Sequence, residues 1–261
     1  MASYFILLPA GGDDEKDMLI ADLFEAGTTG VAEMDEPGGR WMLKASFDTP
    51  EAAGGFDVPV ETDETDWVTV SHLMWKSRLV GERFFFAPSW SAEATPEGRW
   101  RINYQDGAAC GSGEHPSTRH TLVAIEEFVK PGMRVLDLGC GAGILSLGAK
   151  LLGAGVIVGV DIEDDSCRLT RQLAGVPVVQ GMADCLATEA FDLVVANISA
   201  TVLVNFADEI LRVARPGARI VLAGFGVEEA ALVKQVFGVG ADCERIEGEW
   251  SCVVHDLPPI A

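Results

Sequence analysis

The chain has 261 residues, of which 48% are apolar, and a formal net charge of −21 from 40 acidic and 19 basic side chains. This length accommodates one large domain with a smaller appendage. The acidic excess argues against direct binding of nucleic acid, whose phosphates it would repel, and favours a basic protein as partner. An adaptation for solubility would produce the same charge, so charge alone does not separate these two interpretations.

Membrane association and secretion are not expected. The first apolar run, Tyr4–Ala10, is too short to span a bilayer, and no basic segment precedes it. Six scattered cysteines form no CxxC pair, which argues against a metal site and against a disulfide framework. Reduced thiols and the lack of a targeting signal predict a soluble, cytoplasmic protein.

Residues 1–56 predict a small α+β domain. Glu15–Ala26 is expected to be an amphipathic helix with Met18, Leu19, Leu23 and Phe24 on one face. Strands are expected at Tyr4–Leu8, Gly30–Glu33 and Arg40–Phe47, the last two around a turn at Glu36–Gly39. The acidic residues 57–66 are predicted to be a linker.

Residues 67–261 predict a larger α/β domain that opens with short elements. These are helices at Trp67–Arg78 and Thr118–Val129 and strands at Arg83–Ala87 and Arg99–Asn103.

From residue 134 onward, apolar strands alternate with helices, which predicts a doubly wound parallel sheet. The strands are expected at Arg134–Leu138, Val156–Val160, Val176–Val179, Phe191–Val195 and Arg219–Ala223. The helices are expected at Gly143–Leu152, Asp165–Leu173, Thr201–Val213 and Glu228–Phe237. An antiparallel pair, Asp242–Glu247 and Trp250–His255, completes a seven-stranded, Rossmann-like sheet.

A glycine-rich turn follows the first of these strands and opens a helix. Its residues Gly139, Gly141 and Gly143 let a ligand approach the backbone closely. The next strand ends in Asp161, whose carboxylate can accept both ribose hydroxyls of an adenosine. An NAD site uses a similar device, but here the spacing is GxGxG rather than GxGxxG, and Asp137 precedes the glycines. A pyrophosphate would be repelled by that carboxylate, whereas the ammonium group of S-adenosylmethionine would be attracted.

Two polar residues are predicted to complete the site. Asn197 ends the fourth strand at the carboxyl edge of the sheet, where its amide oxygen can accept an N–H from a substrate amine. Its alternative role is to cap the following helix. Upstream, the polar loop from Cys110 leads to Thr118 near a helix start, where its hydroxyl can meet a carboxylate. His115 in that loop is either catalytic or a residue that orders the loop.

The sequence resembles the PrmA family of methyltransferases nearly from end to end. The resemblance rests on DWVTVSHLMWKSRLVGERFFFAPSW from Asp66, GSGEHPSTRHTL from Gly111, VLDLGCGAGILSLGAKLLGA from Val135, DLVVANISA from Asp192 and GEW from Gly248. It differs at Cys110, where the family usually has Phe, at Ile198-Ser199, and in a shortened helix after Asp161.

The resemblance implies a class I S-adenosylmethionine-dependent enzyme that methylates lysine and α-amino groups of a large-subunit ribosomal protein, number eleven. It implies cofactor contacts at Thr118, Gly139, Asp161 and Asn197, and substrate capture by the N-terminal domain. Two alternatives stay open: a lysine methyltransferase acting on another protein, such as the electron-transfer flavoprotein beta subunit, and a catalytically silent cofactor-binding module.

Overall fold

The computed structural model describes residues 3–36, 40–63, 76–104, 115–240 and 244–259. The chain divides into two compact units, Met1–Met74 and Trp75–Ala261, each with its own apolar core. Four predicted features lie wholly or mostly outside the described residues. They are the turn at 37–39, most of the helix at 67–78, the loop at 110–114 and the start of the tail at 242–243. Within the described ranges, no helix combines the length and apolar character needed to cross a bilayer.

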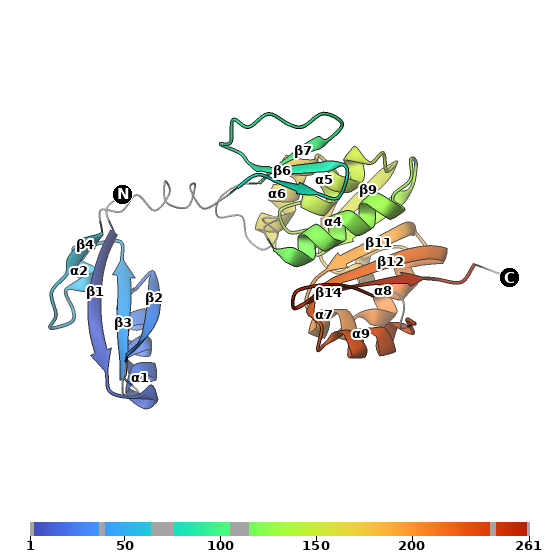
Figure 1. The fold of residues 1–261 in the computed structure, drawn as a ribbon. Coiled ribbons are helices and arrows are strands. Elements are labelled where there is room, and N and C mark those ends of the chain that lie inside the picture. The colour runs from blue at the N-terminus through green and yellow to red at the C-terminus, as the bar shows by residue number, and fades with distance from the viewer. Residues whose placement is uncertain (1–2, 37–39, 64–75, 105–114, 241–243, 260–261) are drawn as a thin grey trace. The chain divides into compact units, whose positions relative to one another are not determined.

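The first unit is an antiparallel sheet of order β2-β3-β1-β4 (Figure 1). Its elements are β1 (Ser3–Ala10), α1 (Asp13–Glu25), β2 (Gly30–Glu36), β3 (Arg40–Phe47), α2 (Pro50–Ala53) and β4 (Glu61–Asp63). Alternate residues of the two central strands, such as Ile6 and Leu43, are buried with Leu23 of α1. The α+β domain predicted for the N-terminus is therefore present.

Two predictions for this unit are wrong in detail. Met18 and Phe24 were expected on the buried face of α1, but they are 70% and 59% exposed. The helix instead packs through Leu19, Ile20 and Leu23, because a turn of about 100° per residue moves the two flanking positions off that face. Part of the predicted linker, residues 57–66, forms β4, which pairs with β1 and extends the sheet.

The second unit is built on a seven-stranded sheet of order β10-β9-β8-β11-β12-β14-β13. The first five strands in that order are parallel, and β14 runs antiparallel to both of its neighbours. The strands are β8 (Arg134–Leu138), β9 (Val156–Asp161), β10 (Val178–Gln180), β11 (Phe191–Asn197), β12 (Ala214–Gly226), β13 (Glu244–Glu247) and β14 (Trp250–Asp256). The predicted doubly wound sheet with an antiparallel closing pair is confirmed.

Helices cover both faces of this sheet, and successive strand residues alternate between two apolar cores (Figure 1). One core contains α4 (Pro116–Phe128), α5 (Ile144–Leu151) and α6 (Asp164–Ala174); the other contains α7 (Ala200–Asn205), α8 (Ala207–Val213) and α9 (Ala230–Phe237). The single helix predicted at Thr201–Val213 is wrong. It is broken at Phe206, whose backbone leaves the helical region at φ −115° and ψ 19° while its ring packs against the second core.

A small three-stranded sheet lies against α4 and α5. It consists of β5 (Arg78–Val80), β6 (Phe84–Pro88) and β7 (Trp100–Tyr104), and Arg78 therefore starts a strand where the end of a helix was predicted. Phe84 and Phe86 of β6 are fully buried in the first core. The Glu126 carboxylate of α4 accepts the backbone N–H groups of the β5–β6 turn at 2.9 and 3.2 Å. This packing fixes α4, which carries the predicted site residue Thr118.

Candidate functional site

The glycine turn after β8 is packed so closely that no side chain fits at two of its positions. Gly139, Gly141 and Gly143 have φ angles of 72°, 51° and 84°, in the left-handed region that favours glycine. A Cβ at Gly139 would lie 2.2 Å from Cγ2 of Ile198, and one at Gly143 would lie 2.7 Å from the Cα of Thr170. The turn is thus packed between helix α6, through Thr170, and Ile198 just after β11.

Asp161 at the end of β9 is oriented by two backbone groups. Its Oδ2 accepts the N–H of Gly141 at 2.9 Å, and its Oδ1 accepts the N–H of Glu163 at 3.0 Å. The carboxylate is only partly buried. Because each carboxylate oxygen has a further lone pair, the group can accept two more hydrogen bonds from a ligand.

Asp137 lies inside the fold with one oxygen unsatisfied. Its Oδ2 accepts the hydroxyl of Ser146 at 2.6 Å, whereas its buried Oδ1 has no hydrogen-bond partner among the described residues. Burial raises the pKa of the Asp137 carboxyl to about 6; the Ser146 bond opposes this rise and the charge of Asp161 adds to it. The site thus contains a buried carboxylate that a cationic ligand would stabilise.

Asn197 and Thr118 meet although they are far apart in the chain. The Asn197 Nδ2 donates to the Thr118 hydroxyl at 3.4 Å, which joins the end of β11 to the first turn of α4. The buried Oδ1 of Asn197 has no partner within the described part of the chain. The helix that follows β11 is capped at Ser199, so Asn197 is not its N-cap residue. Among the described residues, its amide oxygen therefore keeps its capacity to accept a hydrogen bond.

His115 caps the helix that carries Thr118. Its Nδ1 accepts the N–H of Ser117 at 3.3 Å and lies 2.7 Å from the Ser117 hydroxyl, and its ring packs edge-on against Trp250. Burial, and then the nearby Arg119 charge, lower the pKa of His115. These contacts hold His115 at the start of α4, and the loop at 110–114 that it was predicted to order lies outside the described residues.

The strand order arranges these residues along one edge of the sheet. Asn197 ends β11, Asp137 lies in the neighbouring β8, and Asp161 ends β9 on the far side of β8. Carboxyl ends of parallel strands line the ligand crevice of such sheets. An elongated ligand can thus contact Asp161, Asp137 and Asn197 in that order.

Several residues that support the site were not predicted from the sequence. Ser146 holds Asp137, Ile198 covers Gly139, and Thr170 donates to the carbonyl of Gly141 at 2.9 Å. Gly224 has φ 93°, and a Cβ there would lie 3.0 Å from the Asn197 Oδ1. Two sequence features could have indicated these residues: Ser146 is polar on a mostly apolar helix, and Gly224 lies inside a strand.

The family model described as "Ribosomal protein L11 methyltransferase (PrmA)" matches residues 33–257. The chain is 36% identical over 208 residues to the ribosomal protein L11 methyltransferase of Paraburkholderia xenovorans, covering 78% of this chain and 69% of that one. It is 35% identical to the protein of the same name from Burkholderia multivorans, with the same coverage.

A solved structure shows the same fold. It is described as ribosomal protein L11 methylase from Lactobacillus delbrueckii subsp. bulgaricus, with a TM-score of 0.64, 21% identity and coverage of 70% of this chain and 100% of that chain.

The half-satisfied carboxylate of Asp137 should cost stability at neutral pH. Because its pKa in the fold is about 6 against an ordinary 3.8, the folded protein retains the proton longer. The cost is absent below pH 4 and complete above pH 6, where it reaches up to about 3 kcal/mol. Asp137→Asn should therefore raise the free energy of unfolding at pH 7.5, with a gain that vanishes near pH 4. Denaturant unfolding at both pH values measures this.

The exposed Asp184 supplies the matched control, since Asp184→Asn should leave stability unchanged at both pH values. A loss of stability in Asp137→Asn at pH 7.5 would contradict the argument.

Proposed function

Because the chain belongs to the ribosomal protein L11 methyltransferase (PrmA) family, we propose that it methylates lysine and α-amino groups of ribosomal protein L11. The protein is an S-adenosylmethionine-dependent protein methyltransferase. The observation that supports the proposed site best is the buried amide oxygen of Asn197, which has no partner among the described residues and lies beside Thr118 at the carboxyl edge of the sheet.

The residues present fit S-adenosylmethionine. The Asp161 carboxylate has the lone pairs to accept both ribose hydroxyls, and the Asp137 carboxylate offers a negative charge to the methionine ammonium. The left-handed glycines give the turn a backbone conformation that suits a nucleotide site at a helix start. The proposed cofactor-binding residues are Thr118, Asp137, Gly139, Gly141, Gly143, Asp161 and Asn197.

When bound, S-adenosylmethionine supplies an electrophilic methyl group. A lysine must present a lone pair, and its neutral form costs about 4 to 5 kcal/mol at pH 7 because its pKa is near 10.4. A dry pocket lowers that pKa by desolvation. The Asn197 Oδ1 would accept an amine N–H and so direct the lone pair at the methyl group. Because His115 Nδ1 is engaged in the helix cap, loss of the lysine proton to water before the amine enters the dry pocket is the simpler route.

We propose that the N-terminal unit captures the ribosomal protein. The chain carries a net charge of −21, and the first turn of α1 presents Asp13, Asp14 and Glu15. Opposite charge on a basic substrate would accelerate encounter. Because the substrate is a ribosomal protein, we also propose that the enzyme acts in the cytoplasm, without contacting nucleic acid directly.

Asp161→Ala should weaken binding of S-adenosylmethionine by about 1.5 to 3 kcal/mol, because it removes hydrogen bonds to a charged group. Calorimetric titration measures the loss. Asp165→Ala, in an exposed ion pair with Arg168, is the matched control and should bind normally. NAD should give no heat with any variant, and unchanged affinity of Asp161→Ala would refute the ribose contact.

Asn197→Ala should reduce turnover far more than it reduces cofactor affinity, because the amide oxygen is proposed to direct the amine. Single-turnover rates and cofactor titration separate these two effects. Asn205→Ala, on the exposed end of α7, serves as the control. Equal losses in rate and affinity would show that Asn197 mainly holds the cofactor.

Deleting residues 1–74 should leave a unit that folds and binds cofactor, because residues 75–261 have their own core. This unit should no longer methylate the ribosomal protein at an appreciable rate. In the intact enzyme, methylation should slow with salt as the Debye length falls from about 10 Å at 0.1 M to about 3 Å at 1 M. Cofactor affinity should change little. Truncated enzyme as fast as the intact one would show that the catalytic unit recognises its substrate alone.

A further inference from the structure

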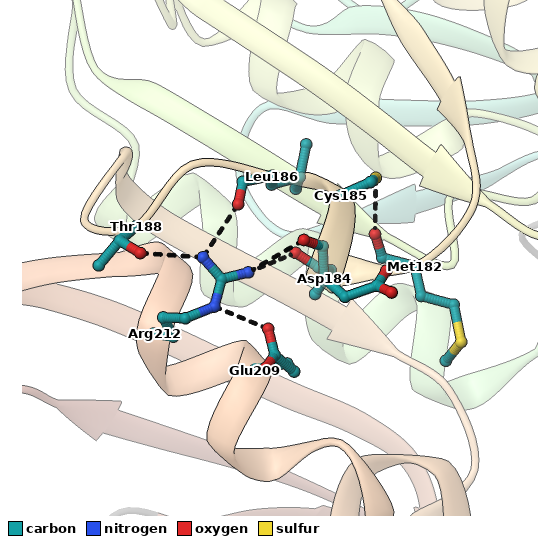
Figure 2. A network of polar contacts seen from close by, with 8 residues as sticks. Met182, Asp184, Cys185, Leu186, Thr188, Glu209 and Arg212 are labelled. Carbon is teal, nitrogen blue, oxygen red and sulfur yellow. Dashed lines mark hydrogen bonds and ion pairs between the residues drawn. The ribbon is translucent and has the colours of Figure 1, made fainter.

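Arg212, near the end of α8, is connected to the segment that follows β10. Its guanidinium Nε donates to Glu209 at 2.7 Å, and its two terminal nitrogens donate to the segment Ala183–Thr188 (Figure 2). The acceptors in the segment are the carbonyl oxygens of Ala183 at 2.9 Å, Asp184 at 3.5 Å and Leu186 at 2.9 Å, and the hydroxyl of Thr188 at 3.0 Å. One side chain thus makes five hydrogen bonds, the full number of N–H groups on a guanidinium.

The backbone of Arg212 anchors the same stretch of chain. Its carbonyl oxygen accepts the N–H of Glu189 at 2.9 Å, and the next carbonyl, of Val213, accepts the N–H of Ala190 at 2.8 Å. These two bonds do not depend on the side chain. A substitution of Arg212 would therefore remove the side-chain bonds to Ala183–Thr188, while the two backbone bonds that lead into β11 remain.

The segment leaves the sheet at the edge where the cofactor is proposed to bind. Gln180 at the end of β10 pairs with Asp161, and the N–H of Gly181 donates to the Asp161 carbonyl at 2.9 Å. The Gln180 amide donates to the carbonyl of Ile162 at 3.1 Å, and the side chain of Ile162 is 62% exposed. The segment 181–186 therefore begins beside Asp161, the residue predicted to bind the ribose.

The strand order decides which part of the cofactor would reach this segment. The acceptor site at Asn197 lies on β11, and the carboxylates for the ammonium and the ribose lie on β8 and β9. Continuing in the same direction, the adenine ring reaches the end of β10. The segment that Arg212 holds starts just beyond that point, after Gly181, and leads to the start of β11 at Phe191.

We propose that Arg212 is a positioning residue for the adenosine end of S-adenosylmethionine, acting through the segment Ala183–Thr188. This inference rests on the proposed function. Without the side chain, the segment samples other arrangements, and the apparent affinity is multiplied by the fraction of molecules that keep the binding arrangement. If a tenth keep it, binding weakens about tenfold. Lysine cannot substitute, because it lacks the planar fork that serves several carbonyl groups at once.

The test compares S-adenosylhomocysteine with 5′-methylthioadenosine, which lacks the amino-acid end. Both are titrated calorimetrically into the full-length wild type, Arg212→Lys and Arg212→Gln, well below each unfolding midpoint. In the Arg212 variants, the affinity for both ligands should fall by the same factor, about tenfold. Arg171→Lys is the matched control, because Arg171 donates to the Val178 carbonyl within β10 and not to the segment. Asp137→Asn should instead lower the affinity for S-adenosylhomocysteine and leave the affinity for 5′-methylthioadenosine unchanged.

Kinetics separate positioning from a purely structural role. The KM for S-adenosylmethionine should rise about tenfold, while kcat at saturating cofactor and the KM for the ribosomal protein stay near their wild-type values. Lower thermal stability with unchanged affinity for both ligands would show a merely structural role and overturn the proposal. An Arg212 variant that loses affinity only for S-adenosylhomocysteine would overturn the proposal as well. A wild type that binds neither ligand would instead refute the proposed function.

Hydrogen exchange on the wild type keeps the proposal testable if the Arg212 variants do not fold. Adding 5′-methylthioadenosine should slow amide exchange in residues 183–188. An unchanged exchange rate in that segment, with the ligand bound, would refute a role at the adenosine end.

Discussion

The close packing of the glycine turn between helix α6 and the end of β11 is the constraint on which the rest of the site depends. Gly139 lies under Ile198, and Gly143 lies against Thr170, at distances that exclude a Cβ. Gly141 between them donates to Asp161 and accepts from Thr170. One turn thereby sets the direction of the Asp161 carboxylate, which is proposed to bind the ribose, and the contact with the end of β11, where Asn197 is proposed to act.

The site retains polar groups that the fold alone does not satisfy. The buried Oδ1 atoms of Asp137 and Asn197 each lack a partner among the described residues, at a typical cost of about 1 to 3 kcal/mol. Better-satisfied residues would stabilise the protein but would leave nothing to accept N–H groups from a ligand. The residues proposed for binding and chemistry thus lower the stability of the fold. The two large cores and the hydrogen bonds that fix α4 compensate for this loss.

Most of the fold followed from local pattern. Alternating apolar strands and helices predicted the doubly wound sheet, and glycines marked where helices end. The errors arose where distant contacts decide local structure. Phe206 breaks a periodic helix because its ring enters the second core, and residues 61–63 form β4 because the edge of β1 offers hydrogen bonds to a polar segment. The buried face of helix α1 differs from the predicted one, because Leu19, Ile20 and Leu23 are the residues that pack against the sheet.

The sequence by itself determined the chemistry of this protein. The glycine spacing, Asp161 and Asn197 indicated a methyl-donor site, because turn geometry and hydrogen-bonding capacity belong to residue types at fixed local spacing. Tertiary structure alone decided which groups meet. It brought the Thr118 hydroxyl within hydrogen-bonding distance of the Asn197 amide, 79 residues away in the sequence. It also brought the Arg212 guanidinium to the carbonyl groups of residues 183–186. Within the described part of the chain it also left the Asn197 Oδ1 without a partner. Hydrogen bonds between distant segments depend on how helices pack on the sheet, which no local pattern encodes.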